Sequence, residues 1–250
     1  MTSLASTEHA SSDGLLAKVQ ALTGLLAEIA AAHTPAVLAS SLSNEDMVLT
    51  DAILRARIDI DIFTLDTGRL HADTLALIAT VRERYGYAIA VYRPDPQAVF
   101  GYVSAFGRDA FYTSTDLRKR CCEIRKVEPL KRALAGKRAW LTGMRREQSI
   151  SRSAVEIRTH DAVHSIEKFS PLADWTEADV WSYIRAFSVP YNRLYDQGYR
   201  SIGCAPCTRP VTPTEDVRAG RWWWEQPENR ECGLHLGPDG KLVRAKAMQS

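Results

Sequence analysis

The chain has 250 residues, 45% of them hydrophobic and 25% charged, which is typical of a soluble globular protein. Five cysteines in a chain of this length do not resemble the disulfide framework of a small secreted protein. The N-terminus lacks a basic region followed by an apolar run, and no stretch approaches the ~18 apolar residues of a membrane span. We therefore expect a cytoplasmic protein without a signal peptide or membrane span.

The net charge of +2 hides a basic block. Between Arg118 and Arg158 there are thirteen Lys and Arg residues but only four Glu and no Asp, an excess of nine, so the rest of the chain carries about −7. Such a block predicts a polyanionic partner, either nucleic acid or a phosphorylated small molecule. Any single charge could instead belong to a solvated helix face.

Alternating strand and helix patterns predict the fold. Residues 1–13 are polar and expected to be disordered, and apolar residues from Leu15 to Ile29 then recur at helical spacing. A buried strand, a turn and a helix follow one another three times, which predicts an α/β fold with a parallel twisted sheet and flanking helices. We place this domain at 14–210 and a flexible tail at 211–250. The predicted strands are 35–39, 58–65, 87–92, 140–142 and 164–169.

Three turns follow predicted strands, and they should meet because ligands of open α/β sheets bind at the carboxyl ends of the strands. The first is a hydroxyl-rich turn into a helix N-terminus, suited to phosphate, although it lacks the Gly-Lys-Ser/Thr of a Walker A loop. Serines at this place also act simply as helix caps. The adjacent arginines of the last turn, with Arg152 close behind, suit an anionic ligand. The residues concerned are Ser40, Ser41, Leu42, Ser43, Asp66, Gly68, Arg145, Arg146 and Gln148.

Four of the five cysteines form two motifs, the adjacent pair Cys121-Cys122 and the Cys204-x-x-Cys207 turn. Neighbouring residues on a helix point about 100° apart, so their thiolates converge poorly on one tetrahedral zinc but can reach different irons of a cubane. This geometry favours a 4Fe–4S cluster. Zinc, buried thiols and a disulfide stay open as alternatives.

The fifth cysteine, Cys232, lies in the tail after three consecutive tryptophans, Trp222 to Trp224. The tryptophans could fill a core or position the tail. Cys232 would act as a nucleophile in its thiolate form, which nearby cations favour. Arg218, Arg221 and His235 are the candidates.

Taken together, these motifs resemble the assimilatory adenylylsulfate reductases, within the adenylylsulfate/phosphoadenylylsulfate reductase family. The resemblance runs from about Pro35 to Leu236 and includes Leu65-Asp-Thr-Gly-Arg69, Gly143-Met-Arg-Arg-Glu-Gln-Ser149 and Glu231-Cys-Gly-Leu-His235. It implies a fold similar to the adenine-nucleotide α-hydrolases. Their modified pyrophosphate loop would be Ser40 to Asp46, where Ser43-Asn44 replaces the Gly-Ala of many relatives.

The resemblance also implies roles for single residues. Cys232 would be the nucleophile and His235 would complete its motif, while Lys126 would lie beside the cluster and Arg218 and Arg221 would contact the substrate. Cys232 would attack the sulfur of adenylylsulfate, AMP would leave, and thioredoxin would release sulfite from the S-sulfocysteine. No thioredoxin domain follows Leu236, so the reductant would be a separate protein. The implied cluster ligands are Cys121, Cys122, Cys204 and Cys207.

Several alternatives remain at this point. A zinc-containing nucleic-acid-binding module would explain the basic block but not Cys232 or the three turns. A tRNA-thiolating enzyme of the same fold would need a Ser-Gly-Gly-x-Asp-Ser loop, which this chain lacks. The expected partners are thus adenylylsulfate, AMP and thioredoxin, with neither nucleic acid nor membrane. The 3′-phosphorylated nucleotide and a homo-oligomer are left open.

Overall fold

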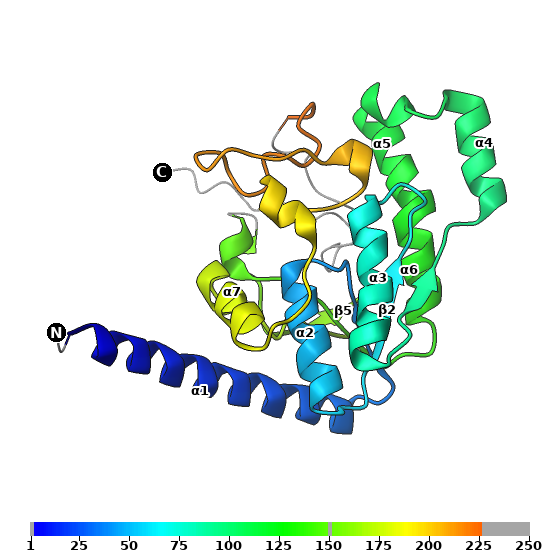
Figure 1. Ribbon diagram of the computed structural model, residues 1–250. Helices are drawn as coiled ribbons and strands as arrows, with labels where there is room; N and C mark the ends of the chain where they lie inside the picture. Colours follow the sequence, from blue (N-terminus) through cyan, green and yellow to red (C-terminus); the bar gives the residue numbers. More distant parts are fainter. Residues whose placement is uncertain (1–2, 150–151, 227–250) are drawn as a thin grey trace, which may run out of the picture.

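A mostly parallel sheet forms the centre of the domain in this computed structural model, which describes residues 3–149 and 152–226 (Figure 1). Its strand order is β3-β2-β1-β4-β6-β5, and every described neighbour pair is parallel except β5 with β6. The strands are β1 (Ala36–Ala39), β2 (Asp61–Leu65), β3 (Ala90–Tyr92), β4 (Ala139–Leu141), β5 (Arg158–Asp161) and β6 (Ile166–Phe169).

The predicted parallel α/β sheet is confirmed, with one correction at its edge. The antiparallel strand β5 was not predicted, because its residues, Arg-Thr-His-Asp, form no apolar run and are mostly exposed. Its place comes from a hairpin with β6, in which Arg158 pairs with Phe169 and Asp161 with Ile166. An edge strand needs only one hydrogen-bonded neighbour and no buried face, so periodicity does not reveal it.

The helices connect the strands and cover both faces of the sheet. They are α1 (Ser3–Ala32), α2 (Asn44–Arg55), α3 (Ala72–Tyr85), α4 (Pro96–Phe106), α5 (Thr115–Cys122), α6 (Glu128–Leu134) and α7 (Glu177–Ala186). A π-helical segment, η2 (Glu123–Val127), joins α5 to α6, and shorter 3-10 turns include η1 (Ala110–Tyr112), η3 (Arg146–Gln148), η5 (Arg193–Gln197) and η6 (Ala205–Cys207).

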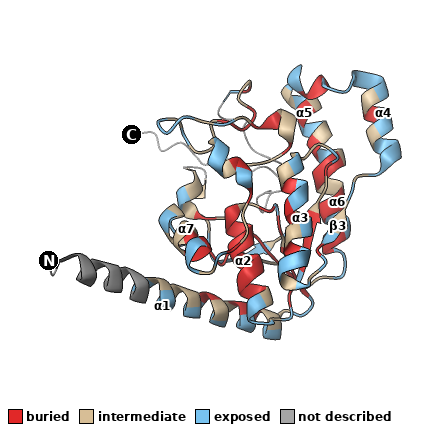
Figure 2. Ribbon diagram, viewed as in Figure 1, coloured by how far each residue is buried: buried red, intermediate tan, exposed pale blue. Residues whose placement is uncertain are grey.

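Alternate residues of the central strands enter two different cores, because successive side chains of a strand point to opposite faces. Leu38 and Leu141 pack in the larger core with residues of α1, α2, α3 and α7. Val37 and Trp140, one residue away, pack on the other face with residues of α6. Helix α2 is buried along most of its length (Figure 2). The hydroxyl-rich turn that precedes the N-terminus of α2 is therefore attached to a helix fixed in the core.

Helix α1 corrects two predictions. It begins at Ser3, where residues 1–13 were expected to be disordered, since the segment contains no proline and several good helix formers. Its part from Gly14 to Ala32 is also long and apolar enough to cross a membrane, contrary to the estimate made from the sequence. Such a helix is weak support for a membrane span, because the core helices of soluble proteins pass the same test. Leu22, Leu26 and Ile29 are indeed buried in the larger core.

Candidate active site

A pocket lies at the carboxyl ends of β1, β2 and β4, where the predicted turns meet. The first loop residue after each strand continues the ladder: Ser40 N donates to Phe63 O at 2.8 Å, and Thr142 N donates to Phe169 O at 2.9 Å. The turns therefore open at one edge of the sheet. The residues that line the pocket include Ser40, Ser41, Ser43, Thr67, Lys126, Gly143, Arg145, Gln148, Cys204, Arg218 and Arg221.

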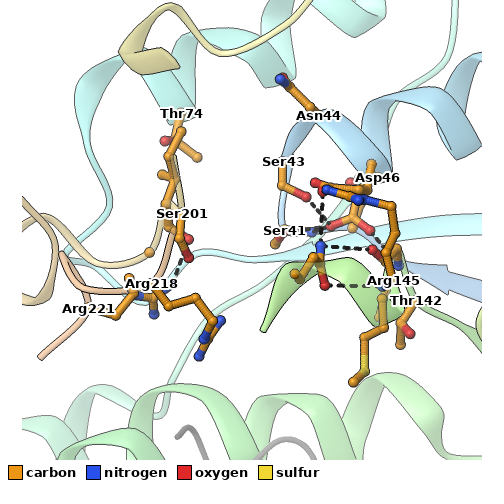
Figure 3. Close-up of a pocket in the computed structure, with 18 of the residues that line it drawn as sticks. Ser41, Ser43, Asn44, Asp46, Thr74, Thr142, Arg145, Ser201, Arg218 and Arg221 are labelled. Carbon is orange, nitrogen blue, oxygen red and sulfur yellow. Dashed lines mark hydrogen bonds and ion pairs between the residues drawn. The ribbon is translucent and has the colours of Figure 1, made fainter. Parts of the chain in front are cut away.

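The first loop is held in shape by Asp46, at the start of α2 (Figure 3). One carboxylate oxygen, Oδ2, accepts from Ser41 N at 2.7 Å, Ser41 Oγ at 2.6 Å and Ser43 Oγ at 3.3 Å. The other, Oδ1, accepts from Gly143 N at 2.9 Å. Burial raises the pKa of Asp46 to about 6, against the opposing effect of these hydrogen bonds. Asp46 thus joins the first loop to the loop after β4.

Leu42 and Gly143 make this close approach possible. Leu42 has a left-handed backbone, with φ of 61°, and a fully buried side chain, so it shapes the loop and does not line the pocket. A Cβ atom on Gly143 would lie 2.5 Å from Asp46 Oδ1. Only glycine fits there without displacing the aspartate.

Arg145 supports the same loop from below. Its Nε donates to Glu45 Oε1 at 2.9 Å, and Gln148 Nε2 donates to the same oxygen at 2.9 Å. Arg145 also pairs with Glu147 and is only 5% exposed. Its charge is therefore largely balanced within the protein. The structure places Arg145 in the pocket wall, where its side chain pairs with Glu45. The sequence had suggested a direct contact with an anionic ligand instead.

Besides Leu42, three residues predicted at the site lie outside the pocket lining. Arg146 forms an ion pair with Asp174 and donates to Val155 O at 2.7 Å, since neighbouring residues in a tight turn point in different directions. Asp66 accepts from Gly68 N at 3.0 Å and pairs with Arg93 at 3.0 Å. Asp66 and Gly68, whose φ is 69°, therefore form the turn, and Thr67 between them lines the pocket.

The four cysteines of the two motifs come together in one buried cluster, with Phe111 and Trp222 beside them. Cys121 and Cys122 end α5, and Cys204 and Cys207 flank the η6 turn. The second strand-end turn holds this region, since Thr67 Oγ1 lies 3.2 Å from Cys204 Sγ and Ala205 N donates to Arg69 O at 2.7 Å. None of the four is in a disulfide bond, so the disulfide alternative is wrong for them.

The four clustered thiols are consistent with the donor set of a metal cluster. Burial raises the pKa of Cys121, and it raises that of Cys207 to about 12. Thiolates would therefore form here as metal binds and releases protons. Within residues 14–149 and 152–226, no three His, Cys, Asp or Glu side chains converge as ligands of one ion. A cubane instead takes one thiolate at each iron, which fits four clustered thiols.

The π-helical segment η2 follows the cysteine pair and places two cations beside it. Arg125 and Lys126 are 8% and 9% exposed. Arg125 Nη1 donates to Thr67 O at 2.7 Å, and a Cβ on Gly68 would lie 3.4 Å from that nitrogen. Lys126 lines the pocket. Much of the basic block is nevertheless paired within the protein. The cations that pair with carboxylates are Arg118, Arg132, Lys137, Arg145, Arg146 and Arg158.

Arg218 and Arg221 reach the pocket from the side opposite the serine loop (Figure 3). Arg221 Nη1 donates to Ile202 O at 2.9 Å, and its guanidinium lies so close to Gly203 that an added Cβ would be 2.4 Å from Nη2. Cys232 and His235 lie outside the described residues. Their predicted roles thus remain predictions.

Several lining residues were not among the predicted site residues. Thr142 ends the predicted fourth strand, so the strand-end argument could have included it. Arg152 was noted near the site without being assigned to it. Arg200 comes from a segment that resembled a loop and gave no signal. The added lining residues include Thr67, Thr142, Arg152, Arg200 and Ser201.

The fold and the site are typical of an α/β domain that binds a nucleotide, with a cysteine cluster beside the pocket. Comparison with family models agrees with this class. Residues 35–210 match the phosphoadenosine phosphosulfate reductase domain, so the chain belongs to that family. Among curated relatives it is similar to the adenosine 5′-phosphosulfate reductase of Burkholderia cepacia, with 57% identity over 222 residues and 89% of each chain covered.

Solved structures support the same fold. The chain resembles the phosphoadenylyl-sulfate reductase of Candida auris, with a TM-score of 0.66, 26% identity, and coverage of 76% of this chain and 90% of that one. It also resembles the FMN adenylyltransferase of Candida glabrata, with a TM-score of 0.55, 13% identity, and coverage of 95% and 76%. The second likeness concerns the fold alone. The expected fold, like that of the adenine-nucleotide α-hydrolases, is confirmed.

Proposed function

We propose that this protein reduces adenosine 5′-phosphosulfate to sulfite and AMP, in sulfate assimilation. The main support is the pocket itself, which is lined both by a serine-rich loop at a helix N-terminus and by Cys204, a member of the cysteine cluster. The similar protein of Burkholderia cepacia is named adenosine 5′-phosphosulfate reductase, which supports the choice of substrate.

In the proposed reaction, the Cys232 thiolate attacks the sulfur of the substrate. A sulfur–sulfur bond forms, the bond between sulfur and the bridging phosphate oxygen breaks, and AMP leaves with the electron pair. One thiol of thioredoxin then attacks Cys232 Sγ and releases sulfite, and its second thiol resolves the mixed disulfide. The buried cluster cysteines make poor nucleophiles, since the pKa of Cys121 and Cys207 is raised, which favours Cys232 for this role.

The protein's own groups bind and orient the substrate. Ser40 lines the pocket at the N-terminus of α2, where the helix dipole favours a phosphate, and Ser41 and Ser43 shape this loop by donating to Asp46. Lys126, Arg218 and Arg221 supply positive charge from the other wall. This arrangement neutralises the phosphosulfate and stabilises the negative charge that develops on the leaving AMP.

A 4Fe–4S cluster is the proposed cofactor, and Cys121, Cys122, Cys204 and Cys207 would hold it. When bound, it would supply a buried negative charge and tie two distant segments together. Among the described residues the cysteines form no disulfide bond, which supports a reducing, cytoplasmic location. A visible spectrum of the anaerobically purified protein, with about four irons per chain, tests the cofactor; a colourless protein that contains zinc would contradict it.

A second candidate substrate is the 3′-phosphorylated nucleotide, after which both the family and the Candida auris enzyme are named. The complete cysteine quartet favours the unphosphorylated one, because within the family the cluster-bearing members resemble enzymes that use it. Steady-state kinetics with both nucleotides and thioredoxin decides between them. A higher kcat/KM for the 3′-phosphorylated nucleotide would overturn the substrate assignment and leave the cysteine chemistry intact.

A further inference from the structure

A buried ion pair joins the helix of the cysteine pair to the segment of the pocket arginines. Arg118 lies on α5, three residues before Cys121, and Glu225 follows the tryptophans. Arg118 Nε is 3.0 Å from Glu225 Oε1, and Nη2 is 2.8 Å from Oε2. The side chains are 1% and 4% exposed. A two-pronged contact of this kind fixes orientation as well as distance.

Trp222 lies between this pair and the pocket. The guanidinium carbons of Arg118 and Arg221 lie 4.8 and 4.6 Å from the centre of its ring. Its backbone is left-handed, with φ of 43°, which is unfavourable for a bulky aromatic residue. Trp222 N donates to Cys207 O at 3.2 Å, and Glu225 N donates to Trp222 O at 2.9 Å. The surrounding contacts therefore hold a turn that this residue would not adopt by itself.

The same turn sets the direction of the pocket arginines. Arg221 directly precedes Trp222 and donates its backbone N–H to Arg218 O at 2.9 Å. The strand-like bridge between Thr208 and Arg221 ties the turn to the segment that follows Cys207. A rotation of Trp222 would therefore displace the Arg221 guanidinium from its place over Gly203.

We propose that Arg118 and Glu225 are positioning residues: they hold Trp222 in its left-handed turn and so aim Arg218 and Arg221 into the pocket. The pair acts on the substrate only through these arginines. The alternative is that the ion pair merely fills the interior. The identity of the ligand rests on the proposed function, whereas the mechanical part of the proposal does not depend on it.

The test replaces both charges, Arg118→Met with Glu225→Met, because an apolar pair of similar size is often tolerated in place of a buried ion pair. The matched control is Arg132→Met with Glu128→Met, which removes an exposed ion pair on α6. Melting temperature and iron content report the fold and the cysteine site. Calorimetry measures AMP affinity, and mass spectrometry follows tryptic cleavage after Arg218 and Arg221.

We expect the buried double variant to fold and to keep its iron, but to bind AMP about tenfold more weakly, the effect of one misplaced charge-assisted contact. Cleavage after Arg221, which is 7% exposed in the structure, should become faster. The control should match the wild type. Unchanged AMP affinity and cleavage in a folded double variant would overturn the proposal.

Arg118→Lys decides the matter if the double variant does not fold, since lysine keeps the charge but loses the two-pronged contact. Its AMP affinity should be reduced, and wild-type affinity with wild-type cleavage would overturn the proposal. A wild-type protein that binds no AMP would contradict the proposed function instead. The cleavage rates would still test whether Arg118 and Glu225 hold Trp222 in its turn.

Discussion

The two walls of the pocket differ in the groups that hold them together. On the strand-end wall, Asp46 and Glu45 accept hydrogen bonds from Ser41, Gly143 and Arg145. On the cysteine wall, Arg221 Nε, Trp222 Nε1 and Trp224 Nε1 are buried donors without an acceptor among the described residues.

Buried donors are rarely left unpaired in a finished protein, because each would lose its bonds to water. The charged side chains of the strand-end wall are paired within the protein, whereas Asn44 Oδ1 and Trp140 Nε1 on the same wall have no hydrogen-bond partner among the described residues. The cysteine wall has the thiols and the N–H groups that suit an anionic inorganic group. Hydrogen bonds to charged groups therefore hold the first wall, whereas in the described part of the chain thiols and unpaired N–H groups gather on the second.

The largest expected effect comes from breaking the cysteine wall. Cys204→Ser removes one of four proposed ligands and the thiol beside Thr67. We expect the visible absorbance and the iron to be lost, and the reductase activity to fall by more than about a thousandfold, since cofactor site and pocket share this turn. Iron analysis and steady-state kinetics check this. Full iron content in the variant would refute the assignment of Cys204.

A second substitution distinguishes the role of Cys232 from that of the four cysteines on the cysteine wall. Cys232→Ser should keep the absorbance and the iron of the wild type, because Cys232 is not a proposed ligand, but it should form no covalent adduct. Intact-mass measurement of wild type with substrate and no reductant should reveal one added SO₃ group. An adduct on any other residue would contradict the mechanism.

The next largest effect on kcat/KM should come from arginines that line the pocket, compared with one that does not. Arg218→Ala and Arg221→Ala should each lower kcat/KM about ten- to a hundredfold, the worth of a charge-assisted contact. Arg146→Ala is the matched control, since its side chain pairs with Asp174 outside the lining, and it should change kcat/KM less than about twofold. Equal effects at all three positions would mean that the pocket boundary is wrong.

The smallest expected effect is a pH-dependent shift in stability on the strand-end wall. Burial raises the pKa of Asp46 from 3.8 to about 6, so the folded state holds this proton more tightly than the unfolded chain. The resulting stabilisation is present below pH 3.8 and is lost as pH rises through 6. It amounts to at most about 3 kcal/mol, since one pKa unit corresponds to about 1.4 kcal/mol.

Asp46→Asn does not titrate, so melting temperatures of both proteins between pH 4 and 7 check this. Any advantage in melting temperature of the wild type over the variant should shrink by several degrees as pH rises. Glu45, Arg145 and Tyr195 also surround Asp46, and their charges are common to both proteins. A constant difference across this range would mean that the pKa of Asp46 is not raised.

Local patterns in the sequence were sufficient for much of the fold and part of the site. Apolar runs marked β1, β2 and β3, and the two shorter predicted segments 140–142 and 164–169 marked β4 and β6. The meeting of the turns and the importance of the cysteine motifs also followed from the sequence. These features depend on residues close in the chain, or on the general rule that parallel strands place their carboxyl ends at one edge.

Only the tertiary structure distinguished residues of the same type. Arg145 and Arg146 are neighbours in the chain, yet one braces Glu45 and the other lies outside the pocket lining. The pairing of Arg118 with Glu225 spans 107 residues, and no local pattern predicts it. Whether a charge is buried, balanced or available depends on packing between distant segments, because desolvation and pairing act through space rather than along the chain.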